Sequence, residues 1–178
     1  NSSANPVLSI RKEGNTPAWG AVYEQYFQEI DKVKGQKGVL SVEKKLFVET
    51  NNGTNRQIRP ITPEQPLRIG DKVIVRLTIR TDREMNYVFL KDLRAGCFEP
   101  ADQLSGPESR DGIWYYRSPK DVSENFFINR LPEGTFVLEY PVYVSRSGEY
   151  AGGISTIQCM YAPEFVSHTA GESLRIMP

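Results

Sequence analysis

The chain of 178 residues is 39% hydrophobic and 25% charged, and its 22 lysine and arginine residues balance its 22 acidic residues, giving a formal net charge of zero. This composition is ordinary for a globular domain with its own core, but a neutral chain lacks the basic surface that binding to nucleic acid requires. No apolar run approaches the ~18 residues of a membrane-spanning helix, so we expect no direct insertion into a membrane.

The N-terminal part contains two candidate strands, Val7 to Lys12 and Trp19 to Gln28, and the stretch from Gln28 to Val33 is compatible with one helical turn. Two strands are too few to bury the face of a sheet on their own. The polar, glycine-containing segment Lys34–Gly38 follows them and indicates a boundary. We therefore expect residues 1–36 to be terminal strands of a preceding β-sandwich domain or a linker, and residues 37–178 to form one domain of ordinary size.

Alternation of apolar and polar residues with period two dominates the chain after the boundary. Such alternation is typical of half-buried antiparallel strands, with one face in a core and one in water. The clearest examples are Leu40 to Val48, interrupted by Lys44, Val73 to Ile79, interrupted by Ile74, and Phe136 to Val144, interrupted by Val137 and Tyr143. Further candidate strands are Tyr87 to Lys91, Ile113 to Arg117, Phe126 to Asn129 and Ser173 to Met177.

Turns rich in glycine and proline separate these strands, for example Ile69-Gly70-Asp71, Leu131-Pro132-Glu133-Gly134 and Ser147-Gly148. No long stretch has helical periodicity, and only Asp121 to Asn125 is a second candidate for a helical turn. Many short strands with regular turns predict an all-β sandwich or barrel.

Residues suited to catalysis or metal binding are few and scattered. The one histidine, His168, lies in Ser167-His168-Thr169, which we interpret as a surface loop, and no G-x-S-x-G motif surrounds a serine. Two cysteines and one histidine without short spacings do not make a zinc site, and no calcium-binding loop or P-loop occurs. We therefore expect a non-enzyme without cofactor or metal. Cys97 and Cys159 could form one disulfide in an oxidising compartment or remain two buried thiols.

Aromatic residues gather in Trp114-Tyr115-Tyr116. Because side chains alternate along a strand, Trp114 and Tyr116 share one face and Tyr115 lies on the other. The pair is either part of a core or a candidate aromatic platform on which a ligand such as a sugar ring stacks.

Six phrases, in order, carry a family resemblance. They are Leu67 to Val73, Tyr87 to Asp92, Arg94 to Pro100, Arg110 to Gly112, Leu131 to Tyr140 and Gln158 to Phe165. Over residues 39–178 they resemble the last, C-terminal macroglobulin-like domain of bacterial α2-macroglobulins of the Bacteroidetes type. A weaker likeness, from Thr16 to Tyr26, is to the final strand of the sandwich that follows the thioester domain in that family.

The resemblance implies an immunoglobulin-like antiparallel β-sandwich, a macroglobulin-like domain with extra N-terminal strands. It also implies a role as a non-catalytic structural and interaction module of a large protease-trapping protein in the bacterial cell envelope, periplasmic or at the surface. The partners would be other domains of the same parent protein, and proteases only through that parent. Neither Cys97 nor Cys159 fits the family's thioester motif C-x-E-Q, so the resemblance implies that the reactive centre lies elsewhere in the parent.

Met160 and Tyr161 fall on the family's Met-Tyr-x-Pro phrase, whose methionine resembles the residue that shields the thioester. A flexible apolar side chain could exclude water from a reactive acyl group by packing alone. Two alternatives remain: Met160 is a core residue beside a capping tyrosine, or the whole chain is a carbohydrate-binding or adhesin-type β-sandwich that uses Trp114 and Tyr116.

Overall fold

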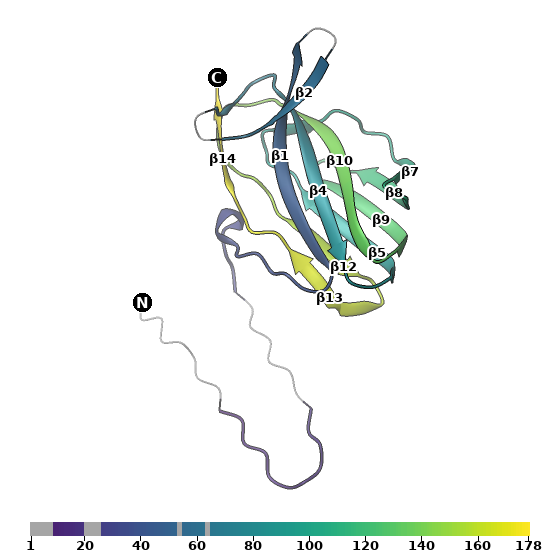
Figure 1. Ribbon diagram of the computed structural model, residues 1–178. Coiled ribbons are helices and arrows are strands. Elements are labelled where there is room, and N and C mark those ends of the chain that lie inside the picture. Colours follow the sequence, from purple (N-terminus) through teal and green to yellow (C-terminus); the bar gives the residue numbers. More distant parts are fainter. Residues whose placement is uncertain (1–8, 20–25, 53–54, 63–64) are drawn as a thin grey trace, which may run out of the picture.

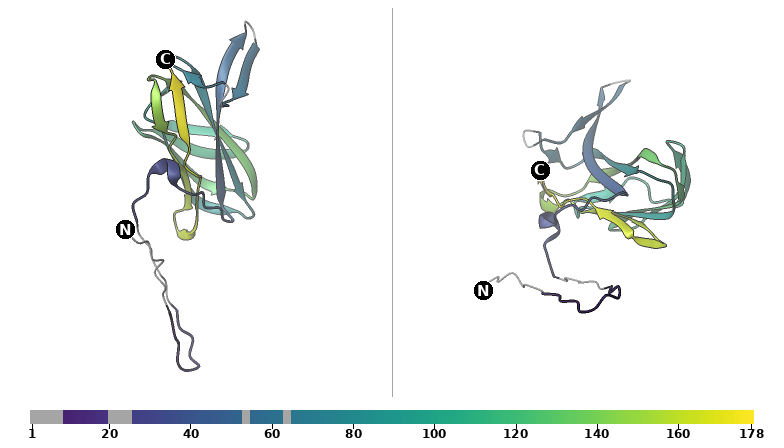
Figure 2. Two further views of the ribbon diagram at one scale, coloured as in Figure 1. Left: turned by 90° about the vertical axis from the view of Figure 1, so that its left-hand side faces the viewer. Right: turned by 60° about the horizontal axis from the view of Figure 1, so that its bottom comes forward.

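The computed structural model describes residues 9–19, 26–52, 55–62 and 65–178. Within these residues the regular structure is strands and one 3-10 turn, η1 (Ile30–Lys32), which confirms the helical turn predicted between Gln28 and Val33. Two sheets pack face to face as a sandwich, and Figures 1 and 2 show the two layers from several sides. The prediction of an all-β, immunoglobulin-like antiparallel sandwich is thus confirmed.

The first sheet has five strands in the order β2-β1-β4-β10-β6, and each neighbouring pair of them is antiparallel. These strands are β1 (Ser41–Asn52), β2 (Asn55–Pro60), β4 (Lys72–Thr81), β6 (Phe98–Pro100) and β10 (Gly134–Val144). β1 takes part in two pairings. Its residues 41–49 pair with β4, and its residues 47–52 pair with β2 in a hairpin that projects from the sandwich (Figure 1).

The second sheet has six strands in the order β13-β12-β5-β9-β8-β7. They are β5 (Met85–Leu93), β7 (Gly106–Arg110), β8 (Ile113–Pro119), β9 (Ser123–Leu131), β12 (Ser155–Cys159) and β13 (Ala162–His168). A small sheet of three strands, in the order β11-β14-β3, joins β3 (Leu67–Arg68), β11 (Gly148–Ala151) and β14 (Ser173–Met177). The β14 bounds agree with the strand predicted from Ser173 to Met177.

Three sequence predictions differ from the structure. The predicted helical turn from Asp121 to Asn125 is wrong, because β9 begins at Ser123. His168 is the last residue of β13 and not part of a loop. The two predicted N-terminal strands are not found where the structure describes them: residues 9–12, Trp19 and residues 26–28 are not in strands. The other residues of these two predicted strands lie outside the described residues.

The core lies between the two large sheets and is built from the alternating apolar residues. On β4 and β10 the odd and even positions, respectively, point inward, and Val73, Leu77, Leu138 and Val142 are fully buried. They pack with buried residues of the opposite sheet such as Ile157. Burying each such side chain contributes about 1.5–3 kcal/mol, so this alternation accounts for the pairing of the two layers.

A buried polar cluster interrupts this apolar core. The Asp92 carboxylate on β5 accepts hydrogen bonds from the Lys44 ammonium (2.8 Å), the Ser155 hydroxyl (2.8 Å) and the Tyr140 hydroxyl. Burial, together with the neighbouring Asp92 carboxylate, raises the pKa of Tyr140 well above its usual value, so the phenol remains a donor. Lys44, which interrupts the alternation in the sequence, therefore points inward as its position in the strand requires.

Both cysteines are free and buried in this structure. The Cys159 thiol lies 3.3 Å from the carbonyl oxygen of Asn86, and burial raises the pKa of the Cys97 thiol to about 11. Of the two alternatives for the cysteines, the structure favours two separate buried thiols. The two sheets are therefore held together by non-covalent contacts, without a disulfide between Cys97 and Cys159.

Candidate interaction surface

Met160 and Tyr161 form the two-residue turn between β12 and β13, because Cys159 lies opposite Ala162. Both side chains are exposed, Met160 by 55% and Tyr161 by 80%. The alternative of a core methionine is therefore wrong. Turns of this kind are usually rich in Gly, Asn, Asp, Ser and Pro, so two large side chains that are exposed together at this position are unusual.

Tyr87 on β5 supports this turn from the neighbouring strand. Its backbone carbonyl accepts a hydrogen bond from the Met160 N–H at 2.9 Å. Its ring packs edge-on against the Tyr161 ring, with centroids 5.1 Å apart and an angle of 83° between the planes. Tyr87 has φ of 56°, a left-handed conformation that costs a residue with a Cβ about 1–2 kcal/mol. Sequence reasoning placed Tyr87 in a strand and gave no signal for this role.

The other pair of sequence-predicted residues lies on the outer face of the same sheet. Trp114 and Tyr116 on β8 are exposed by 72% and 47%, whereas Tyr115 between them is buried in the core, as the alternation predicted. Tyr116 lies opposite Phe127 on β9, and Phe127 lies opposite Phe89 on β5. The Phe89 and Phe127 rings stack with centroids 4.9 Å apart and an angle of 24° between the planes.

A hollow of about 480 Å³ adjoins Trp114 at one end of this face. Its lining combines the rings of Trp114, Tyr116 and Phe127 with the polar side chains of Asn129 and Arg130. Exposed rings beside an amide and a guanidinium can bind a ligand that has apolar faces and hydroxyl groups.

The outer face of the five-stranded sheet has a different character. Several of its outward-facing side chains form ion pairs: Glu139 on β10 accepts from Arg76 on β4 and from Arg110 at the end of β7, at 2.6 Å each. Although burial acts in the opposite direction, these two guanidinium groups lower the pKa of the Glu139 carboxyl. Lys72 pairs with Glu49 at 2.9 Å on the same face. This face of the sandwich therefore carries paired charges, whereas the outer face of the six-stranded sheet carries a larger group of exposed aromatic side chains.

His168 lies beside a pocket of about 430 Å³ between β1 and residues 152–153 and 168–172. Its Nδ1 lies 3.1 Å from the carbonyl oxygen of Thr169. In the described residues no serine or cysteine side chain hydrogen-bonds to this ring, and no group of three or more potential metal ligands comes together. No helix within the described ranges is long and apolar enough to cross a membrane.

Comparison with known proteins gives this immunoglobulin-like sandwich a family. Residues 40–164 match the family of the bacterial alpha-2-macroglobulin MG10 domain. The chain belongs to this family and is thus a domain of an alpha-2-macroglobulin-like protein, as the six sequence phrases predicted.

Solved structures with the same fold come from the same class of protein. A Salmonella alpha-2-macroglobulin with a tyrosine-to-glycine mutation superposes with a TM-score of 0.64, at 21% identity, over 82% of this chain. Native Escherichia coli alpha-2-macroglobulin, from domain MG7 to the C-terminus, superposes with a TM-score of 0.62, at 16% identity, over 81% of this chain. These likenesses extend the family assignment to the arrangement of the strands.

The chain spans only a small part of each relative. It covers 10% of the Salmonella chain and 24% of the Escherichia coli chain. A curated relative, the Circularly permutated Ras protein 2 of Dictyostelium discoideum, is 28% identical over 109 residues, which are 61% of this chain and 3% of that protein.

Proposed function

We propose that this chain is the non-catalytic, C-terminal macroglobulin domain of a protease-trapping alpha-2-macroglobulin-like protein in a bacterial envelope, of the Bacteroidetes type. Its partners are other domains of the parent protein, and it meets proteases only through that parent. The observation that carries the proposal is the exposed turn of Met160 and Tyr161 in a member of the MG10 family. This turn packs against a thioester-type domain and shields its reactive acyl group.

The geometry of the turn suits shielding because it combines large apolar side chains with a rigid support. A thioester is lost when water or an amine attacks its carbonyl carbon, so a close apolar contact slows the loss by exclusion. Tyr87 restrains both the backbone of Met160 and the ring of Tyr161, which limits the entropy lost when the turn docks.

The division between residues 1–36 and 37–178 is part of the proposal. Trp19 and Phe27 are fully or almost fully exposed, as expected for residues that pack in a preceding domain. The residues just before the boundary contact the sandwich. Gln36 pairs with His168, and the Gly171 N–H donates to the Val33 carbonyl oxygen at 2.8 Å.

Amine uptake by the full-length parent tests the shielding role. Methylamine is a suitable probe, since the Salmonella relative has been crystallised after reaction with it. We expect Tyr161→Gly to accelerate incorporation of a labelled amine at least about tenfold without protease, because about 1.4 kcal/mol of exclusion corresponds to that factor. Tyr143→Gly, on the opposite face, is the control. Equal uptake by both variants, or no uptake by any form, would overturn the shielding role.

A carbohydrate-binding or adhesin-type module is the second candidate, and the exposure of Trp114 and Tyr116 beside Asn129 favours it. Sugar binding would perturb the Trp114 fluorescence. Titration with a panel of oligosaccharides, with Trp114→Ala as the control, decides whether this candidate survives.

A further inference from the structure

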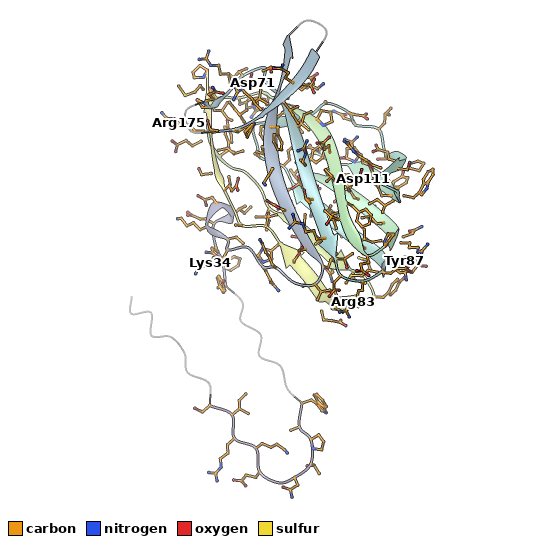
Figure 3. The ribbon with its side chains drawn as sticks, in the orientation of Figure 1. Lys34, Asp71, Arg83, Tyr87, Asp111 and Arg175 are labelled. Carbon is orange, nitrogen blue, oxygen red and sulfur yellow. The ribbon has the colours of Figure 1, made fainter. Side chains whose placement is uncertain are left out.

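The aromatic face and the Met160–Tyr161 turn are continuous with each other. Tyr116, Phe127, Phe89 and Gln158 lie opposite one another across four adjacent strands, β8, β9, β5 and β12. Tyr87 precedes Phe89 by two positions on β5, so it lies toward the same side of the sheet, and its ring contacts Tyr161. Figure 3 places Tyr87 at the same end of the sandwich as Arg83. The two candidate sites are thus joined by Phe127, Phe89 and Tyr87.

This continuous surface is large for a single domain. Six of its side chains are exposed: Tyr87, Trp114, Tyr116, Phe127, Met160 and Tyr161. At ~200 Å² for each large side chain, their exposed fractions together amount to roughly 700 Å². The largest apolar patch of a typical monomer is about 300–600 Å², and a stable protein interface buries about 800 Å² on each partner. The area fits a folded protein surface and exceeds the footprint of one sugar ring.

The composition of the surface also favours a protein partner. Trp, Tyr and Met in the centre and charged pairs at the rim are typical of protein interfaces. Here Arg130, which lines the hollow beside Trp114, pairs with Glu84 (2.7 Å), and Arg83 pairs with Asp82 (2.9 Å) in the connection between β4 and β5. Phe89 and Phe127 stack on each other, and a ring used in this way presents less of its face to a sugar.

We infer that the outer face of β8, β9 and β5 and the Met160–Tyr161 turn form one docking surface, and that its occupant is another folded domain of the same polypeptide. The inference rests on the proposed function, because docking of the turn brings the rest of this face against the same neighbour. It extends the contact beyond the turn to Trp114, about 14 Å away across three strand spacings.

Hydroxyl-radical labelling of the intact parent protein, read out by mass spectrometry, tests the inference. Tyr116 and Tyr143 are a matched pair, because they are exposed by 47% and 44% on opposite faces of this domain. We expect Tyr116, Trp114 and Phe127 to be protected with Tyr161, and Tyr116 to react at least about fivefold more slowly than Tyr143, because interface cores are fully buried. Trp114→Glu should restore the labelling of Tyr116, whereas Tyr143→Glu should not.

The other outcomes overturn the inference in distinguishable ways. Protection of Tyr161 without protection of Trp114 and Tyr116 would limit the interface to the turn and leave the proposed function standing. Free labelling of both regions would remove the proposed function as well. Protection that is lost on dilution would identify a second copy as the occupant, and protection that requires added oligosaccharide would identify a sugar site.

Discussion

The ammonium group of Lys44 lies 2.8 Å from the carboxylate of Asp92, and the two residues belong to opposite sheets of the sandwich. Lys44 also donates to the carbonyl oxygens of Leu93 (2.9 Å) and Gly152 (3.2 Å). All three ammonium hydrogens thus have acceptors, and the Asp92 side chain is fully buried. The pair thus cross-links the two layers of the sandwich.

Asp92→Ala should therefore be strongly destabilising. It leaves the Lys44 ammonium without its counter-charge in a buried position, which costs about 3–5 kcal/mol. Arg83→Ala is the control, since its pair with Asp82 is exposed and contributes about 0–1 kcal/mol. Chemical denaturation measures both. A loss below 1 kcal/mol for Asp92→Ala would mean that the pair is not a structural link.

At position 87, glycine should be at least as stable as alanine. Both variants lose the ring that contacts Tyr161, so the comparison isolates the backbone: glycine adopts positive φ without steric cost, whereas alanine keeps about 1 kcal/mol of strain. At position 143, on a regular strand, we expect the usual order, with alanine more stable than glycine. The free energies of unfolding of the four variants test the reversal, and the same order at both positions would contradict it.

Gly153→Ala should destabilise the fold much more than Gly70→Ala. Both glycines have positive φ, but a Cβ at Gly153 would lie 2.1 Å from the Leu93 carbonyl oxygen, while a Cβ at Gly70 meets open space. We expect about 1 kcal/mol for Gly70→Ala and at least ~3 kcal/mol for Gly153→Ala, because the neighbour is backbone and cannot turn aside. Similar thermal unfolding of the two variants would show that this approach relaxes easily.

The pH dependence of stability should contain a contribution from Glu139. Partial burial of Glu139 acts to raise its pKa, but Arg76 and Arg110 lower the pKa below the ordinary 4.5. A carboxyl with a lowered pKa in the folded state contributes stability that is complete above its unfolded pKa and is lost as the pH falls through the folded value. The wild type should thus lose stability below about pH 4.5, and Glu139→Gln should lose less over that range. Parallel pH profiles would contradict the assignment.

Cys97 should be unreactive in the native state. Burial raises its pKa to about 11, so the nucleophilic thiolate is scarce at pH 8, and the side chain is inaccessible as well. Iodoacetamide at pH 8 should label Cys97 only after unfolding, as followed by peptide mass spectrometry. Rapid labelling of the folded protein would show that this part of the core opens readily.

The fold could be predicted largely from the sequence because its strands obey one local rule. Residues such as Val73 and Leu138 alternate with polar neighbours, and a sheet with one buried face requires that pattern. The rule failed between Asp121 and Asn125, where the inward residues are polar. Glu124 is buried there between Arg94 (3.1 Å) and Arg117 (2.7 Å), and partners so distant in the sequence cannot be recognised from one segment.

The candidate surface was predicted only in part for the same reason. Met160, Tyr161, Trp114 and Tyr116 were identified from a family phrase and from a cluster of aromatic residues. Their continuity depends on the register that places Tyr116 beside Phe127 and on the unusual backbone of Tyr87. Neither register nor a left-handed conformation at a tyrosine is encoded in a local pattern.

The path by which the chain enters the domain affects how a mechanical load would pass through it. Before reaching β1, the chain pairs at Gln36 with His168. The backbone of Ile30 also packs closely on Gly171: a Cβ added to Gly171 would lie 1.8 Å from the Ile30 carbonyl oxygen. Tension applied upstream of Ile30 would thus act first on the segment between β13 and β14. Because β13 pairs with β12 in the hairpin that carries Met160 and Tyr161, part of this tension would reach that hairpin through His168.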